Sequence, residues 1–253
     1  MSLSDKTIIL TGGASGIGKA TALLLARHGA RVFVGDRNPE AGAAMLLEAA
    51  AEKLPISFAR LDITDPELAA SFVDGVHAEI GGAADGLVNV AGWDQVEPFL
   101  QNTPALWEQL LDINLLGVIR MTRLVLDPMI AAKRGMIVNI ASDAGRVGSS
   151  GEVVYSAAKG GQIAFTKALA REMARHNIRV NCVCPGPTET PLMFAQVGEN
   201  AAKIVQGMLR AIPLGRLAQP EDIAGPIMFF LEDRAAYITG QVLSVSGGLT
   251  MVD

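Results

Sequence analysis

The chain has 253 residues, of which 50% are hydrophobic and 19% are charged, and it carries a formal net charge of −5. This apolar content excludes intrinsic disorder, and an acidic balance without a run of Lys or Arg argues against a nucleic-acid partner. No stretch reaches the roughly 18 to 20 uninterrupted apolar residues of a membrane span, so we expect no membrane partner. The mean hydropathy of +0.33 therefore implies burial inside the chain or against another subunit.

The beginning of the chain and its two cysteines indicate a cytoplasmic protein. Residues 1–6 lack the charged and then apolar segments of a secretory signal. Cys182 and Cys184 are two residues apart, a spacing at which a disulfide would be strained, and no histidine lies near them to complete a metal site. We expect reduced core thiols and no metal.

Short β-branched runs alternate with longer Ala/Leu-rich segments along the whole chain. The expected strands are 7–11, 31–35, 56–61, 86–90, 136–141, 178–183 and 241–245, and the expected helices are 17–28, 39–53, 66–80, 106–130, 153–176 and 220–231. This alternation is typical of a parallel sheet covered by helices on both faces. We predict an α/β fold in which residues 1–253 form a single Rossmann-type, doubly wound domain with a seven-stranded parallel sheet.

Two features stand out from this alternation. The helix expected over 106–130 is apolar around nearly its whole circumference, and the one over 153–176 is similar, which favours burial against the sheet on one side and a second subunit on the other. Residues 185–198 contain three prolines and two glycines. We expect them to begin a mobile substrate loop, around residues 185–210.

A glycine-rich loop follows the first expected strand and opens the first helix. Its sequence, Thr11-Gly-Gly-Ala-Ser-Gly-Ile-Gly18, allows a tight turn and a close approach of backbone to a pyrophosphate at the helix N-terminus. Asp36 follows Gly18 by 18 residues, near the spacing of the acid that binds the adenosine ribose. A carboxylate there repels a 2′-phosphate and favours NAD over NADP, although the neighbouring Arg37 could receive such a phosphate.

A second group of polar residues follows the fifth expected strand. Ser142 comes directly after the strand, and Tyr155 and Lys159 lie four residues apart on the next helix, so both can face one cavity. A phenol has a pKa of about 10, and a nearby ammonium or an oxidised nicotinamide would favour the phenolate. Tyr155 could then accept the proton of an alcohol while hydride leaves for a cofactor.

Together these motifs resemble the short-chain dehydrogenase/reductase family over essentially the entire chain. Asn89-Val-Ala-Gly92 is similar to the family's Asn-Asn-Ala-Gly motif, with Val90 in place of the second asparagine. The resemblance implies cofactor binding by Gly12, Ser15, Gly16, Ile17, Gly18, Asp36, Arg37, Asp62, Ile63, Asn89, Ala91, Gly92, Tyr155, Lys159, Pro185, Gly186, Thr188 and Thr190.

The resemblance also implies a role for each of the catalytic residues Asn114, Ser142, Tyr155 and Lys159. Ser142 would polarise the substrate oxygen and Tyr155 would be the acid and base. Lys159 would lower the pKa of the tyrosine and hold the nicotinamide ribose, and Asn114 would anchor a water linking Lys159 to solvent. The family is commonly tetrameric through the two apolar helices, so we expect a homotetramer.

Loop residues choose the substrate in such folds. The candidate substrate residues are Trp93, Gln95, Ser142, Asp143, Arg146, Met193 and Phe194. Trp93 and Phe194 could equally well serve packing. For Arg146, a salt bridge to Asp143 or Glu152 is favoured over a substrate contact. We expect a small-molecule alcohol or ketone, favouring a β-hydroxyacyl-CoA such as an alicyclic 2-hydroxycarboxyl-CoA. The alternatives are a 3-oxoacyl-thioester reductase using NADPH, a broad secondary alcohol or sugar-alcohol dehydrogenase and, outside enzymes, a nucleotide sensor or scaffold.

Overall fold

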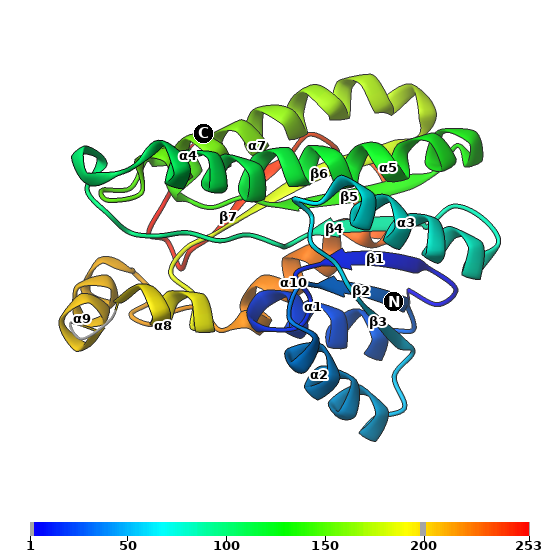
Figure 1. The fold of residues 1–253 in the computed structure, drawn as a ribbon, viewed down its shortest axis with the longest axis horizontal. Coiled ribbons are helices and arrows are strands. Elements are labelled where there is room, and N and C mark those ends of the chain that lie inside the picture. Colours follow the sequence, from blue (N-terminus) through cyan, green and yellow to red (C-terminus); the bar gives the residue numbers. More distant parts are fainter. Residues whose placement is uncertain (1–2, 198–200, 253) are drawn as a thin grey trace.

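The computed structural model describes residues 3–197 and 201–252. Its centre is a seven-stranded parallel sheet with the strand order β3-β2-β1-β4-β5-β6-β7 (Figure 1). The strands are β1 (Thr7–Thr11), β2 (Arg31–Asp36), β3 (Ile56–Arg60), β4 (Gly86–Asn89), β5 (Gly135–Ile140), β6 (Ile178–Pro185) and β7 (Val242–Val245). The predicted Rossmann-type fold is confirmed, and chain order reverses between β1 and β4, where such sheets bind ligands.

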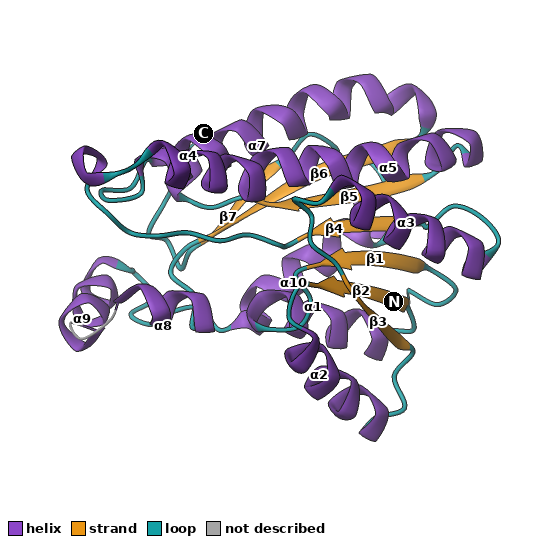
Figure 2. Cartoon of the chain, viewed as in Figure 1, coloured by secondary structure: helices purple, strands orange, loops and turns teal. Residues whose placement is uncertain are grey.

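Helices cover both faces of the sheet, which explains why its central strands are continuous apolar runs (Figure 2). One face carries α1 (Gly16–Arg27), α2 (Pro39–Ala51) and α10 (Pro220–Leu231), whose buried side chains form one core with β1, β2 and β5. The other face carries α3 (Pro66–Ile80), α5 (Gly117–Ala132) and α7 (Val153–Met173), which form a second core. All residues of β4 and β5 are buried between the two layers.

The single helix expected over 106–130 is wrong in detail, because a π-helical turn interrupts it. The segment consists of α4 (Pro104–Leu111), a π-helical turn over Asp112–Leu116, and α5. The turn places the buried Asn114 side chain against the segment after β4, where its Nδ2 donates to the carbonyls of Trp93, at 2.6 Å, and Leu110, at 2.9 Å. Such turns frequently mark functional sites, and this one orients a predicted catalytic residue.

The segment expected to be irregular is largely helical. Thr190 directly precedes α8 (Pro191–Val197), and its Oγ1 accepts a hydrogen bond from the N–H of Met193 at 3.2 Å. The helix α9 (Ala201–Ala211) follows. Both helices lie beyond the carboxyl ends of the strands, away from the main sheet layers (Figure 1). Residues 198–200 lie outside the described part of the chain, and movement of this segment stays a prediction.

The two cysteines lie on the same face of β6. Both thiols are free and buried, and their Sγ atoms are 4.0 Å apart. Among the described residues, no three His, Cys, Asp or Glu side chains gather as a metal site, and no described helix is long and apolar enough to cross a membrane.

Candidate active site

Two cavities open at the carboxyl end of the sheet. The first, of about 570 Å³, is lined by most of the residues predicted to bind the cofactor: Gly12, Ser15, Gly16, Ile17, Gly18, Asp36, Arg37, Asp62, Ile63, Ala91, Gly92 and Thr190. The second, of about 510 Å³, is lined by Ser142, Asp143, Tyr155, Lys159, Pro185, Gly186, Thr188 and Met193. Ile17, Gly92 and Thr190 line both, so the predicted cofactor and catalytic residues face neighbouring parts of one site.

The glycine loop fits a dinucleotide because its backbone leaves no room for side chains. A Cβ on Gly12, whose φ is +70°, would lie 2.6 Å from Cα of Ala91, and a Cβ on Gly18 would lie 2.0 Å from the carbonyl oxygen of Gly12. The N-cap Ser15 makes no side-chain hydrogen bond to the first turn of α1. The N-terminus of α1 therefore presents backbone N–H groups suited to an anionic pyrophosphate.

Asp36 lies at the end of β2, on the wall of the cofactor cavity. One carboxylate oxygen accepts from the N–H of Ala14 and the other from the N–H of Asn38, each at 3.0 Å. The two bonds hold the carboxylate in place, and its remaining lone pairs can accept ribose hydroxyls.

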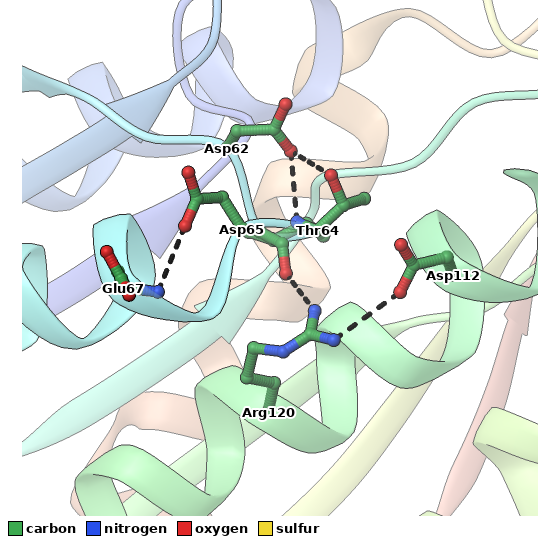
Figure 3. Close-up of polar contacts among 7 residues, drawn as sticks. Asp62, Thr64, Asp65, Glu67, Asp112 and Arg120 are labelled. Atoms are coloured by element: carbon green, nitrogen blue, oxygen red, sulfur yellow. Dashed lines mark hydrogen bonds and ion pairs between the residues drawn. The ribbon is translucent and has the colours of Figure 1, made fainter.

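A network of polar contacts holds the part of the cofactor cavity wall formed by Asp62, Thr64 and Asp112 (Figure 3). Asp62 accepts hydrogen bonds from the N–H and Oγ1 of Thr64, at 2.9 and 2.7 Å. Burial alone would raise the pKa of Asp62, but these bonds and the charges of Arg37 and Arg60 hold it below its usual value. Arg120 donates to the carbonyl of Ile63 and reaches Asp112 at 3.5 Å, which ties the cavity wall to α5.

Asn89 is the predicted cofactor residue that the structure places elsewhere. Its side chain is buried and donates to Thr122 Oγ1 and Asn139 Oδ1, at 3.1 and 2.9 Å, beneath the sheet face covered by α5 and α7. It is not among the residues lining either cavity, so its side chain serves the packing of the sheet, and a cofactor contact of Asn89 stays a prediction. Val90, the departure from the family motif, lines both cavities.

Ser142, Tyr155 and Lys159 meet in the second cavity as predicted. The Ser142 side chain lies close enough to Tyr155 to lower the pKa of the phenol, and Lys159 Nζ lies 5.6 Å from the centre of the Tyr155 ring. Nζ also donates to the carbonyl of Ile140 at 2.8 Å, which anchors the buried lysine to β5.

The ionisation of this group differs from the expectation. Burial, followed by the charges of Asp94 and Glu152, raises the pKa of Tyr155, whereas the hydrogen bond with Ser142 lowers it. Burial also lowers the pKa of Lys159 to about 8. The expected low pKa of Tyr155 is therefore wrong for the protein alone, because desolvation of the phenolate outweighs the nearby ammonium.

Gln162 is a polar residue of this site that the sequence analysis missed. It is fully buried on α7, three residues after Lys159, and its Nε2 donates to the carbonyl of Asn114. It thereby joins α7 to the π-helical turn. A polar residue inside an apolar helical run was the signal in the sequence, but its partner lies 48 residues away.

The predicted substrate residues do not gather as one group. Met193 and Asp143 line the catalytic cavity and Trp93 lines the cofactor cavity, but Gln95 and Phe194 are exposed and line neither. The predicted salt bridge of Arg146 is also wrong. Its guanidinium donates to Ser244 Oγ and to the carbonyls of Val242 and Val252, because the loop packs against β7 and the end of the chain.

The cavity at the glycine loop adjoins the cavity that contains the Ser142 hydroxyl, the Tyr155 phenol and the Lys159 ammonium, and both lie on a Rossmann fold. This arrangement defines a nicotinamide-dependent oxidoreductase, in which substrate and cofactor meet at the edge of the sheet.

Comparison with known proteins agrees with this class. Residues 12–250 match the family model described as enoyl-(acyl carrier protein) reductase. The chain is 40% identical to the 3-oxoacyl-(acyl-carrier-protein) reductase FabG of Thermotoga maritima, over 99% of this chain and 100% of that protein. It is 37% identical to the cyclopentanol dehydrogenase of Comamonas testosteroni, over 98% of each chain.

A solved structure gives the same result. A short-chain type dehydrogenase/reductase from Mycobacterium ulcerans superposes with a TM-score of 0.92 and 31% identity, covering 98% of this chain and 91% of the other. The chain belongs to the short-chain dehydrogenase/reductase family, and it is an oxidoreductase of CH–OH and C=O groups.

Proposed function

We propose that this protein is an NAD-dependent oxidoreductase that interconverts a secondary alcohol and its ketone, with a β-hydroxyacyl-CoA as substrate. The observation that carries the proposal is that Ser142, Tyr155 and Lys159 line one cavity, which adjoins the cavity of the glycine loop. Asp36 on the cofactor wall supports NAD.

The chain's own residues supply the acid–base chemistry. Ser142 donates a hydrogen bond that orients the substrate oxygen, and Tyr155 removes the hydroxyl proton in oxidation or returns it in reduction. The residues of the glycine loop and Lys159 would hold a nicotinamide cofactor, which would supply the hydride-transfer chemistry and, when oxidised, a positive charge that favours the tyrosinate. Lys159 contributes positive charge near the phenol and can bind the nicotinamide ribose, while Asn114 anchors a water that links Lys159 to solvent.

Two kinds of similarity support the acyl substrate. The stretches 91–94, 141–152 and 238–250 resemble 2-hydroxycyclohexanecarboxyl-CoA dehydrogenase, which suggests an alicyclic 2-hydroxycarboxyl-CoA. An alicyclic 2-hydroxycarboxyl-CoA combines features of the substrates that two relatives are named for. One relative is a reductase of an acyl thioester, and the other is a dehydrogenase of a cyclic secondary alcohol, cyclopentanol.

A second candidate is reduction of a 3-oxoacyl thioester with NADPH. The 40% identity to a 3-oxoacyl-(acyl-carrier-protein) reductase favours it, and Asp36 argues against its cofactor. Assays of hydroxyacyl thioesters and simple secondary alcohols, each with NAD and with NADP, distinguish these two candidate functions. Turnover of simple alcohols without any hydroxyacyl-CoA would contradict the proposed substrate.

Asp36→Asn is expected to raise the ratio of kcat/KM with NADP to that with NAD by at least about tenfold, since about 1.4 kcal/mol of relieved repulsion corresponds to that factor. The change keeps the size of the side chain and removes the charge that would face a 2′-phosphate, next to Arg37. Asp74→Asn, on the exposed side of α3, is the control and should leave the ratio unchanged. An unaltered ratio in Asp36→Asn would remove the basis for assigning NAD.

We further propose a homotetramer formed through the outer faces of α4, α5 and α7. Leu116 in the π-helical turn and Val153 at the start of α7 are 49% and 47% exposed in the single chain. Covering such side chains is favourable, by about 25 cal/mol per Å² of apolar surface. Light scattering of the purified protein gives the mass directly, and a monomer would contradict this assembly.

A further inference from the structure

Two carboxyl groups lie beside the catalytic tyrosine and have no part in the chemistry described above. Asp94 belongs to the segment that follows β4 and is 4% exposed, and Glu152 is the N-cap residue of α7. They lie close enough that Glu152, after burial, raises the pKa of Asp94. The two segments are also joined through the backbone, because the N–H of Glu97 donates to the carbonyl of Gly151 at 2.8 Å.

This carboxyl pair faces the reaction site. Glu152 lines the catalytic cavity together with Ser142 and Tyr155, and it precedes Tyr155 by less than one helical turn. After burial, the charges of Asp94 and Glu152 are the largest contributions to the raised pKa of Tyr155. A charge close enough to act on the phenol also acts on a charged substituent of a substrate whose hydroxyl binds that phenol.

The pair holds one proton near neutral pH. Two carboxyls in contact cannot both ionise without strong repulsion. Burial and then Glu152 raise the pKa of Asp94 to about 8, against the opposing charge of Lys159. Asp94 is therefore mostly neutral near pH 7, and Glu152 is the carboxyl group of the pair that lines the cavity.

None of the other described charged groups of this cavity forms a salt bridge with Glu152. Asp143, also on the wall, accepts a hydrogen bond from Ser244 Oγ at 2.5 Å, and Arg146 is occupied by Ser244 and backbone carbonyls. Lys159 is anchored on the carbonyl of Ile140, and burial brings its pKa to about 8. A substrate carboxylate entering here would meet acidic groups from the segment after β4, the loop after β5 and the start of α7.

We propose that the Asp94–Glu152 pair sets the charge selectivity of the catalytic cavity: it admits a hydroxyacyl compound whose carboxyl is masked as a thioester or ester, and it rejects the free hydroxy acid. This deepens the proposed function and rests on it for the acyl group of the substrate. The carboxylate of a free β-hydroxy acid lies only two bonds from the carbinol carbon, and therefore within a few ångströms of Tyr155. Repulsion at about 6 Å with an effective dielectric constant of about 20 corresponds to a preference of roughly 100-fold for the neutral compound.

The test uses two probes that differ only in this charge, 2-hydroxycyclohexanecarboxylate and its ethyl ester, assayed with NAD. The wild-type ratio of kcat/KM for ester to acid is expected near 100. In Glu152→Gln it is expected to fall about tenfold or more, and the variant is also measured with Asp94→Asn added, because loss of the Glu152 charge lowers the pKa of Asp94. Both compounds are measured at the same pH, so a change in the ionisation of Tyr155 cancels in the ratio. Glu97→Gln is the matched control: this carboxylate lies in the same segment, accepts from Asn102 at 2.9 Å and does not line the cavity.

A second readout separates electrostatics from a change of shape. Oxidation requires Tyr155 to lose its proton, so kcat/KM rises with pH through the pKa of Tyr155. Removing the charge of Glu152 lowers that pKa, so the rising limb for the ester should move to lower pH in Glu152→Gln and stay in place in Glu97→Gln. An unchanged ester-to-acid ratio in Glu152→Gln, or a limb that does not move, overturns the proposal.

A wrong assignment of the substrate can be distinguished from a wrong assignment of charge selectivity. If the wild type oxidises cyclohexanol but neither acyl compound, the hydroxyacyl assignment is wrong. The same ratio is then measured as inhibition constants of the ester and the acid against cyclohexanol. Weaker inhibition by the acid that disappears in Glu152→Gln supports the pair, and equal inhibition in the wild type overturns it.

Discussion

Tyr155→Phe is expected to bind NADH as the wild type does and to lose about 100- to 10,000-fold in kcat, the range that a positioned acid–base group contributes. Phenylalanine keeps the ring next to Lys159 and removes the hydroxyl from the cavity that Tyr155 and Ser142 both line. The proton of the substrate alcohol then has no acceptor of suitable geometry. Steady-state kinetics and a titration of NADH fluorescence measure the two quantities separately.

The second tyrosine of the chain provides the control. Tyr237 is fully exposed, outside both cavities, so Tyr237→Phe should alter neither kcat nor NADH affinity. Retention of full activity in Tyr155→Phe would remove the tyrosine from the proposed mechanism. Loss of activity together with loss of NADH binding would show damage to the site rather than loss of its acid and base.

Gly18→Ala is expected to weaken NADH binding at least about tenfold and to lower the free energy of unfolding by about 1 to 3 kcal/mol, the range for overpacking a tightly packed site. The added Cβ would lie 2.0 Å from the carbonyl oxygen of Gly12 and 2.9 Å from Cα of Gly13. Since these contacts are backbone atoms, α1 must move away from the loop. Urea denaturation and the NADH titration measure both effects.

Gly75→Ala is the control for Gly18→Ala, because it makes the same substitution in a helix where no backbone atom lies close to the new Cβ. Gly75 lies in α3, and a Cβ there meets no atom within 4 Å. Alanine favours a helix over glycine by roughly 0.5 to 1 kcal/mol, so this variant should be as stable as the wild type or slightly more stable. Equal stability and NADH affinity in Gly18→Ala and Gly75→Ala would contradict the proposed packing of the glycine loop.

Local sequence predicted the sheet well because the relevant information is periodic or lies within a few residues. β1 matches its expected bounds and α3 runs over Pro66–Ile80 as expected, since a buried strand and a capped amphipathic helix are determined by neighbouring residues. The spacing of Tyr155 and Lys159 is a property of one helix. Their meeting with Ser142 in one cavity followed from the expected order of strand, loop and helix.

Elements that depend on distant partners were predicted less well. The π-helical turn that orients Asn114 depends on the carbonyl of Trp93, 21 residues away, and apolar periodicity carries no sign of it. The prolines and glycines of 185–198 suggested an irregular loop, yet Thr190 directly precedes a helix there whose Met193 packs with Ile212 and Leu217. Asn89 matched a motif, but its partners Thr122 and Asn139 place it beneath the sheet.

The sequence by itself determined the class of fold, and it indicated the glycine loop and the candidate reacting groups, because each depends on residue type at short spacing. Only the tertiary structure decided how these groups ionise and what surrounds them. It brought Asp94 and Glu152 together beside Tyr155, 58 positions apart in the chain, and it turned Arg146 toward β7. A pKa depends on burial and on charges brought close by folding, and these are properties of the folded chain rather than of its local sequence.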